Sequence, residues 1–348
     1  MGLVFVANVQ GKTTPLDDYE TDSIVTEFLS NTELDEFVVS LEKAGIYHEI
    51  IHDEEGFLEW MAHGRLNFGR PQPIVYNLAQ NGTGPARLSL VPGLCRLHHI
   101  PLLDSDGYVV ALTQHKHHSA AVMRQSGLPV MDSWLYTEHG WQAGRPDDGL
   151  KIIAKPSYDS ASIGIHSDSV FCIDDHAEQR LSALVRRYRQ PFTVQQFISG
   201  HEIEVPVFGG FPPTIPMAVG IALRNQRNLQ DSILIYDDVF SNGYAFYDFS
   251  TESSSFAKEM IEIARAAYSC LGFKGAARID FRIGADGLPK IMEVACKPHL
   301  TKHSSFMHVM EAHGHSHEDL MKYLVGEAVS RLYSADQNWM SLNRNPRP

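Results

Sequence analysis

The stretch "GAARIDFRIGADGLPKIMEVACKP", from Gly275 to Pro298, places two acidic residues inside runs that otherwise read as buried strands. The runs 277–283 and 288–294 are rich in Ile, Val, Phe and Met, and "ADG" between them is a hairpin turn signal. If Asp286 and Gly287 form a two-residue turn, antiparallel pairing places Asp280 opposite Glu293. The hairpin therefore decides where two carboxylates meet.

Two carboxylates that lie directly opposite on one face of a sheet repel each other, so a cation is expected between them. A hard divalent cation such as Mg2+, itself bound to a phosphate, meets that need because it prefers oxygen ligands. The alternative is an edge hairpin whose polar face is solvated. This stretch alone leaves both interpretations open.

Composition limits the function classes that remain. The 348 residues are enough for two or three domains, and the net charge of -13 disfavours a nucleic-acid partner. Four widely spaced cysteines suit reduced thiols, and no apolar run approaches the ~20 residues of a membrane span. We expect a soluble, cytoplasmic protein with no membrane partner.

Strand and helix patterns alternate along the chain, as in α/β folds. We expect a surface loop at 138–149, and a last helix at 316–332 that begins with a capping box formed by Ser316 and Asp319. The other expected strands are 2–8, 73–79, 151–157, 169–173, 192–198 and 202–210; the other helices are 22–45, 113–130 and 254–271, and 89–103 reads as a helix followed by a strand.

Two further stretches carry candidate chemistry. Lys155 ends an apolar strand, where an unpaired ammonium is costly to bury, and the small residues 160–164 that follow could fold their N–H groups over phosphate oxygens. Glu202 and Glu204 alternate on one face of the next strand and could bind ribose hydroxyls. An ordinary loop and an exposed strand face are the alternative interpretations.

Taken in order, these stretches resemble the ATP-grasp superfamily, and most closely its D-alanine:D-alanine ligases, over residues 73–332. The blocks that carry the resemblance are the segment 76–130, "AKPSYDSASIGI", "QQFISGHEIEV", "ARIDF" and "EVACKPHLTKHSSF". The resemblance implies an α/β (α+β) ATP-grasp fold. Its domains would be an N-terminal α/β domain at 1–105, a central lobe at 106–190 and a C-terminal lobe at 191–348.

The resemblance also implies roles for single residues. The nucleotide would be gripped at its phosphates by Lys116 and Lys155, and Asp280 and Glu293 would bind Mg2+, or Mn2+ in its place. Arg278 would stabilise charge on the carbonyl oxygen as a catalytic residue together with Lys155 and Ser304. The remaining implied ATP contacts are Ser162, Ile163, Gln195, Gln196, Phe197, Ile198, Glu202 and Met292, and the implied substrate contacts are Arg278, His303 and Ser304.

The activity that the resemblance implies is ligation of a carboxylate to an amine. ATP would phosphorylate the carboxylate, and an amine would then expel phosphate from the acyl phosphate, so positioning and electrostatics would carry the rate. The partners would be small-molecule amino-acid, carboxylate and amine substrates, and a homodimer is compatible with the family. An ATP-grasp enzyme with a different carboxylate or acceptor, and a nucleotide-binding protein without turnover, are the alternatives.

The sequence departs from the family pattern at three points. "VANVQGKTTPLDDYE" stands where the family has a Gly/Ser-rich loop, a Lys-Tyr pair is missing after Phe249, and Ala295 stands where the metal motif ends in Asn. Arg224 or Arg227 could replace the missing cation. These departures favour a specialised-metabolism relative over the housekeeping peptidoglycan enzyme. The histidine runs 115–118 and 313–317 are expected to be structural or solvated.

Overall fold

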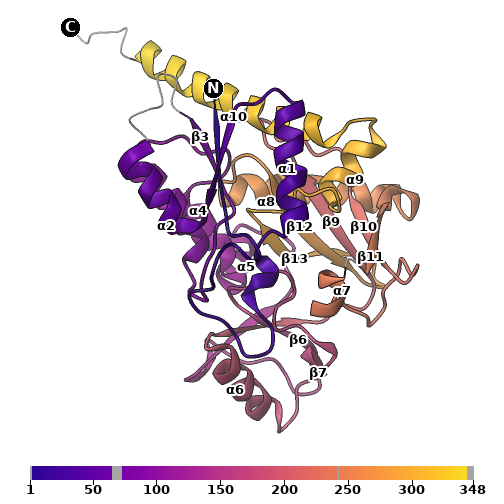
Figure 1. The fold of residues 1–348 in the computed structure, drawn as a ribbon. Coiled ribbons are helices and arrows are strands. Elements are labelled where there is room, and N and C mark those ends of the chain that lie inside the picture. The colour runs from indigo at the N-terminus through magenta and orange to yellow at the C-terminus, as the bar shows by residue number, and fades with distance from the viewer. Residues whose placement is uncertain (1, 65–72, 242, 343–348) are drawn as a thin grey trace, which may run out of the picture.

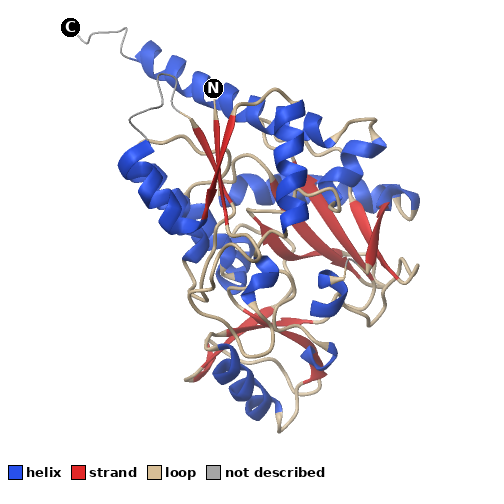
Figure 2. Ribbon diagram, viewed as in Figure 1, coloured by secondary structure: helices blue, strands red, loops and turns tan. Residues whose placement is uncertain are grey.

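The protein contains three β-sheets in one chain, and the computed structural model describes residues 2–64, 73–241 and 243–342 (Figure 1). The first sheet is parallel, with β1 (Leu3–Ala7) between β2 (His48–His52) and β3 (Ile74–Asn77). Helices cover both of its faces (Figure 2), as a parallel sheet requires. These helices are α1 (Asn31–Lys43) and α10 (His317–Leu342) on one face and α2 (Asp53–Glu59) and α3 (Leu90–Leu97) on the other.

The second sheet is antiparallel and has the strand order β5-β4-β8-β6-β7. Its strands are β4 (Ser133–Thr137), β5 (Gly140–Gln142), β6 (Lys151–Pro156), β7 (Val170–Cys172) and β8 (Phe192–Gln196). Helix α6 (Ala177–Tyr188) packs on this sheet. Tyr19, Ile24 and Phe28, from the connection between β1 and α1, enter the same hydrophobic cluster. The first 30 residues therefore help to build the second sheet's core.

The third sheet is also antiparallel, with the order β11-β10-β9-β12-β13. Helix α8 (Ser254–Leu271) covers one face through an apolar stripe that includes Met260 and Ala264. The strands are β9 (His201–Val207), β10 (Val219–Leu223), β11 (Tyr244–Asp248), β12 (Ala277–Ile283) and β13 (Pro289–Ala295). The remaining helices are α4 (Gly107–Gln114), α5 (Lys116–Gln125), α7 (Tyr236–Phe240) and α9 (Ser305–Ala312).

Most expected elements are confirmed, and two expected helices begin later than expected because a cap residue starts each of them. The helix expected over 22–45 is a short 3-10 turn, η1 (Ile24–Glu27), followed by α1, because Ser30 and Glu33 form a capping box that starts a new helix. The helix expected over 113–130 begins instead at Lys116, since His115 is its N-cap. The strand expected near 100–103 is only a bridge at Leu102.

Two smaller expectations near surface segments have opposite outcomes. The surface loop expected over 138–149 contains strand β5, which pairs with β4. The capping box of Ser316 and Asp319 is confirmed: the Asp319 carboxylate accepts from the Ser316 backbone N–H at 3.1 Å, and the Ser316 hydroxyl accepts from the Asp319 N–H at 3.3 Å.

In the hairpin of β12 and β13, Asp280 pairs with Glu293 as expected, but the turn and the register differ from those expected. The two-residue turn at Asp286 and Gly287 is wrong: β12 ends at Ile283 opposite Pro289, so residues 284–288 form the turn. A β-bulge shifts the register between Asp280 and Phe281: Asp280 pairs with Glu293, whereas Phe281 pairs with Ile291. Met292 is the extra residue on β13 and has no partner on β12. The bulge compensates for the longer turn, and Asp280 lies opposite Glu293.

All four cysteines are free, as the sequence indicated. Among the described helices, none is long and apolar enough to cross a membrane.

Candidate active site

A cavity of about 220 Å³ lies where the three sheets meet. Its walls come from the first sheet's loops, the second sheet with α5, and the exposed face of β9, β12 and β13. Among the expected site residues, the cavity lining contains Lys116, Lys155, Ser162, Ile163, Phe197, Ile198, Glu202, Arg278, Asp280, Met292 and Glu293. Gln195, Gln196, His303 and Ser304 are not among the lining side chains.

Three carboxylates form a row across the third sheet. Asp280 on β12 is paired with Glu204 on one side and with Glu293 on the other. Ile203 and Val205 point into the hydrophobic core, so Glu202 and Glu204 share the cavity face as expected. A row of like charges is unfavourable unless cations separate them.

Arg278 neutralises the centre of this row. Its guanidinium binds both oxygens of Asp280, at 2.7 Å and 2.8 Å, and lies 3.2 Å from Glu204. Burial acts to lower the pKa of Arg278, but Asp280 and Glu204 raise it well above its ordinary value. Burial raises the pKa of Glu204 to about 7, against the opposing effect of Arg278.

Two lysines hold the end of the row. The Lys116 ammonium is 3.2 Å from Glu293, and that of Lys155 is 3.8 Å from its other oxygen. Burial would raise the pKa of Glu293, but the two lysines lower it below its ordinary value. Burial lowers the pKa of Lys155, because it disfavours the charged ammonium, and the nearby Glu293 carboxylate opposes that shift. The lysine expected to meet a ligand is thus buried beside a carboxylate.

The small-residue loop expected to cover phosphates has an unusual backbone. Ala161, Ser162 and Gly164 all have positive φ angles, of 50°, 55° and 71°. Turns that contain such residues can direct successive N–H groups to one side, where they bind anions. The Gly164 N–H donates to Asp22, and the Ser162 hydroxyl donates to the Leu234 carbonyl, so the loop is held from two sides.

The far end of the cavity is apolar. Phe197, Ile198 and Met292 line it, and the bulge in β13 turns Met292 toward it. Gln195 anchors this wall because its side-chain amide donates to the Met292 carbonyl at 2.8 Å. The backbone N–H of Gln196 donates to the Asp132 carbonyl at 2.8 Å, which fixes the strand end.

Glu202 is oriented by an arginine that sequence reasoning missed. Arg282 binds the Glu202 carboxylate at 2.9 Å and donates to the carbonyls of Ile198, Gln230 and Ser232. Its alternation with Arg278 and Asp280 along β12 was the available signal.

His303 and Ser304 lie beside the cavity rather than in its wall. Ser304 is the N-cap of α9: its hydroxyl accepts from the Met307 N–H at 3.2 Å and donates to Thr301. The His303 ring packs 4.9 Å from Tyr244, and its Nε2 is buried without a hydrogen-bond partner. The cavity wall in this region is formed by residues 297–301.

Neither proposed replacement for the missing loop cation reaches the cavity wall. Arg227 binds Glu252 at 2.8 Å and lies over the Tyr247 ring, and Arg224 is exposed. Besides Arg278 and the two lysines, the cations that line the wall are Arg282 and Lys297, and Lys297 is paired with Asp104.

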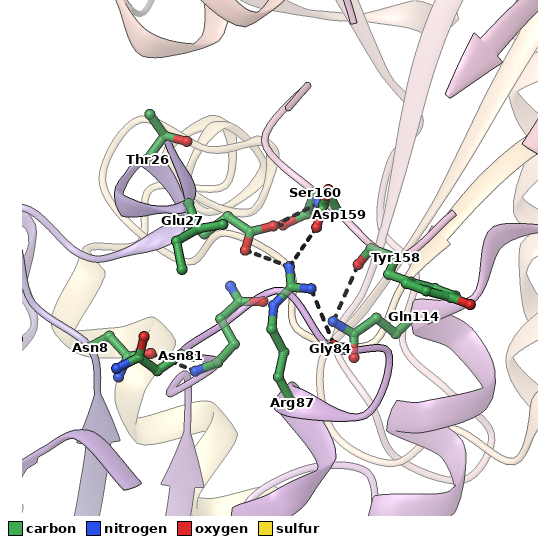
Figure 3. Close-up of polar contacts among 12 residues, drawn as sticks. Asn8, Thr26, Glu27, Asn81, Gly84, Arg87, Gln114, Tyr158, Asp159 and Ser160 are labelled. Carbon is green, nitrogen blue, oxygen red and sulfur yellow. Dashed lines mark hydrogen bonds and ion pairs between the residues drawn. The ribbon is translucent and has the colours of Figure 1, made fainter. Parts of the chain in front are cut away.

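The first sheet's loops contribute a second buried ion cluster, shown in Figure 3. The Arg87 guanidinium lies 2.7 Å from Glu27 and 3.1 Å from Asp159, and both carboxylates border the cavity. Lys116 also donates to the Asp159 carbonyl. Sequence reasoning missed this cluster, because its members are far apart in the chain.

Comparison with known proteins identifies the family. Residues 122–326 match the model described as "D-ala D-ala ligase C-terminus". D-alanine–D-alanine ligase A of Salmonella typhimurium is 24% identical over 88% of this chain and 90% of that protein. The D-alanine–D-alanine ligase of Sodalis glossinidius is 29% identical over 78% of this chain and 72% of that protein.

A solved structure supports the same fold. The D-alanine–D-alanine ligase from Bacillus anthracis, complexed with ATP, superimposes with a TM-score of 0.70 at 16% identity, covering 97% of this chain and 100% of that one. The family model covers more than half of the present sequence. The chain therefore belongs to the D-alanine–D-alanine ligase family of the ATP-grasp superfamily, a family of ATP-dependent ligases that form carbon–nitrogen bonds.

Proposed function

We propose that this protein joins a carboxylate to an amine through an acyl phosphate and releases ADP and phosphate. The observation that carries the proposal is the arrangement of Asp280 and Glu293 opposite each other, with Lys116 and Lys155 beside Glu293 in one cavity. Carboxylates for a metal and ammonium groups for phosphates are the parts that phosphoryl transfer needs.

The nucleotide would extend from the lysines to the apolar end of the cavity. Lys116 and Lys155 would bind the phosphates, and Ser162 and Ile163 would cover them. At the other end Phe197, Ile198 and Met292 would pack on adenine, backbone groups of Gln195 and Gln196 would read its edge, and Glu202 would bind ribose. The lining of the cavity by most of these side chains supports this path.

The residues present fit a divalent metal held together with a phosphate. Among the described residues, no group of three or more His, Cys, Asp or Glu side chains could hold a metal alone. Mg2+ is commonly bound by one or two carboxylates and substrate phosphates, which matches the pair Asp280 and Glu293. Mg2+, or Mn2+, would offset the negative charge of the phosphates when bound.

The chain's own cations would then act on the reacting groups. Lys116 and Lys155 would offset charge on the transferring phosphoryl group, and Arg278, which lies opposite Ala295, would stabilise the oxyanion of the acyl intermediate. His303 and Ser304 would contact the substrate after a shift in the adjoining turn. We assign no covalent enzyme nucleophile, since the acyl phosphate is itself reactive.

The chain is proposed to act in specialised metabolism on substrates other than two D-alanines. Ala295, which lines the cavity, offers no side-chain oxygen to a second metal. His299 forms part of the cavity wall in the segment after β13. Both features change the part of the cavity where substrates would lie.

The test is an ADP-release screen of both enantiomers of the amino acids, singly and in pairs, extended to simple carboxylic acids with hydroxylamine as the acceptor. We expect ADP and phosphate in equal amounts, together with a hydroxamate that traps the acyl phosphate. Formation of AMP and pyrophosphate would move the protein to an adenylating class. Absence of carboxylate-dependent ADP release would leave a nucleotide-binding protein without turnover.

A further inference from the structure

The end of the cavity that faces the first sheet carries a carboxylate whose two oxygens are both engaged. In Glu27, Oε2 lies 2.7 Å from Arg87, and Oε1 accepts from the Ser160 backbone N–H at 2.7 Å and from its hydroxyl at 2.6 Å (Figure 3). The Glu27 side chain is 0% exposed. Glu27 is therefore a part of the wall, and a ligand cation could bind it only by breaking these contacts.

Arg87 keeps its charge in this buried position. It also binds Asp159 at 3.1 Å, whose other oxygen accepts from Gln190 at 2.6 Å. Burial acts to lower the pKa of Arg87, but Glu27 and Asp159 raise it above its ordinary value. The single guanidinium thus offsets one of the two negative charges at this end of the cavity, and both carboxylate side chains are 0% exposed.

Pairing of a carboxylate with a cation of the protein is found around the whole described cavity lining. Every carboxylate that lines the cavity and is described has a cation of the protein within 4 Å, although Arg87 and Arg278 are each shared by two carboxylates. The pairs are Glu27 and Asp159 with Arg87, Glu202 with Arg282, Glu204 and Asp280 with Arg278, and Glu293 with Lys116. Because the Glu27 and Asp159 side chains are 0% exposed, the ammonium of a free amino acid would be desolvated at this end without touching a counter-ion, which is costly.

The remaining wall at this end is mostly apolar, with Gln80 as a polar side chain from the loop after β3. Leu29, Phe37, Leu78 and Leu88 come from the first sheet's loops and α1, and Leu300 comes from the segment after β13. This surface suits a hydrocarbon group better than a charged one.

We propose that the acid activated in this cavity has an apolar body and no free amino group, as in an N-acylated amino acid or a simple branched carboxylic acid. This substrate class rests on the proposed ligase function. A carboxylate oxygen forms a bond to the γ-phosphorus of ATP while the bond to ADP breaks. The amine nitrogen then bonds to the acyl carbon, phosphate leaves with the electron pair of the carbon–oxygen bond, and the amine releases a proton.

The test compares matched acids with one acceptor. Isocaproate and both enantiomers of N-acetyl-leucine are assayed against both enantiomers of leucine and D-alanine, with hydroxylamine, by ADP release and hydroxamate formation. We expect the acids without a free amine to exceed the free amino acids in kcat/KM by at least about tenfold. Faster turnover of a free amino acid overturns the substrate class and leaves the ligase function standing. Absence of ADP release with every acid overturns both.

Two variants of the ion cluster test the physical cause. Arg87→Gln leaves the charge of Glu27 without its buried partner, so the preference should shift toward free leucine by about tenfold. Glu27→Gln removes the charge but keeps the shape, and it should preserve the preference for N-acetyl-leucine. Circular dichroism checks the fold of each variant. Loss of the preference in Glu27→Gln, or an unchanged preference in folded Arg87→Gln, contradicts the role of this cluster.

Discussion

Asp280 and Glu293 lie directly opposite each other on β12 and β13, yet different cations neutralise them. Arg278 binds both oxygens of Asp280, whereas Lys116 and Lys155 lie beside Glu293. These contacts offset the repulsion that the pairing would otherwise cause. A bound metal would take the place of the cations beside Asp280 and Glu293, and the phosphates of a nucleotide would bind the two lysines. Ligand binding would therefore compete with the internal ion pairs.

Lys155→Met should weaken ATP binding and leave the fold intact. A charge-assisted hydrogen bond is worth about 1.5–3 kcal/mol, so the Kd should rise by about 10- to 150-fold. Titration calorimetry measures the change, and Lys258→Met, on the exposed side of α8, is the matched control. An unchanged ATP titration for Lys155→Met would remove this lysine from the nucleotide site.

Catalysis should need more Mg2+ than nucleotide binding does. Ala295 lines the cavity opposite Arg278 but lacks a side-chain oxygen, so a second metal would rely on water ligands. Ala295→Asn should lower the Mg2+ concentration at half-maximal turnover. Titrations of ATP binding and of turnover check this. Equal Mg2+ dependence of both in the wild type, with no response to Ala295→Asn, contradicts it.

Glu204 should make the metal-free protein less stable as pH rises. Its pKa is raised to about 7 in the folded state from its ordinary value of 4.5, so the folded protein binds more protons than the unfolded chain between these values. Stability should fall across pH 4.5 to 7, by up to ~3 kcal/mol. Denaturant titrations of wild type and Glu204→Gln measure it. The variant should show a flatter profile, and parallel profiles would exclude this residue as the cause.

Gly200→Ala should destabilise the third sheet strongly. Gly200 joins β8 to β9 with a φ of 152°, and an added Cβ would lie 1.9 Å from the Ile283 carbonyl oxygen. We expect a loss of about 3 kcal/mol in the free energy of unfolding.

Gly326→Ala is the control for that substitution. No atom lies within 4 Å of its added Cβ, and it stands within α10, so it should gain about 0.5–1 kcal/mol. Thermal and denaturant unfolding compare both variants with the wild type. Similar stabilities for Gly200→Ala and the wild type would mean that the β8–β9 turn is misplaced.

The sequence was most informative where a pattern is local. The limits of α8 and the strand positions of Lys155 and Asp280 follow from periodicity and turn residues, which act over a few positions. Even there, the pairing of Asp280 with Glu293 depended on a five-residue turn and a bulge at Met292 that no local rule indicated. Two departures from the expected geometry offset each other.

Long-range partners could not be predicted in the same way. Arg87 and Asp159 are separated by 72 positions, and Glu27 meets Ser160 from 133 positions away. Alternation along a strand says that a side chain faces the cavity, but not which distant charge will neutralise it. Helix starts at Ser30 and His115 were missed for a simpler reason, since apolar periodicity runs through both caps.

The connection between β1 and α1 makes hydrogen bonds to two parts of the loop 160–164 that borders the cavity. Asp22 accepts from the Gly164 N–H, and Glu27 accepts from Ser160, so one segment holds both the loop proposed to cover the phosphates and the wall beside the proposed acid. A nucleotide that orders the loop also orders Glu27, and the coupling free energy must be reciprocal. An acid seated against that wall should therefore raise the affinity for ATP by the same factor by which ATP raises the affinity for the acid.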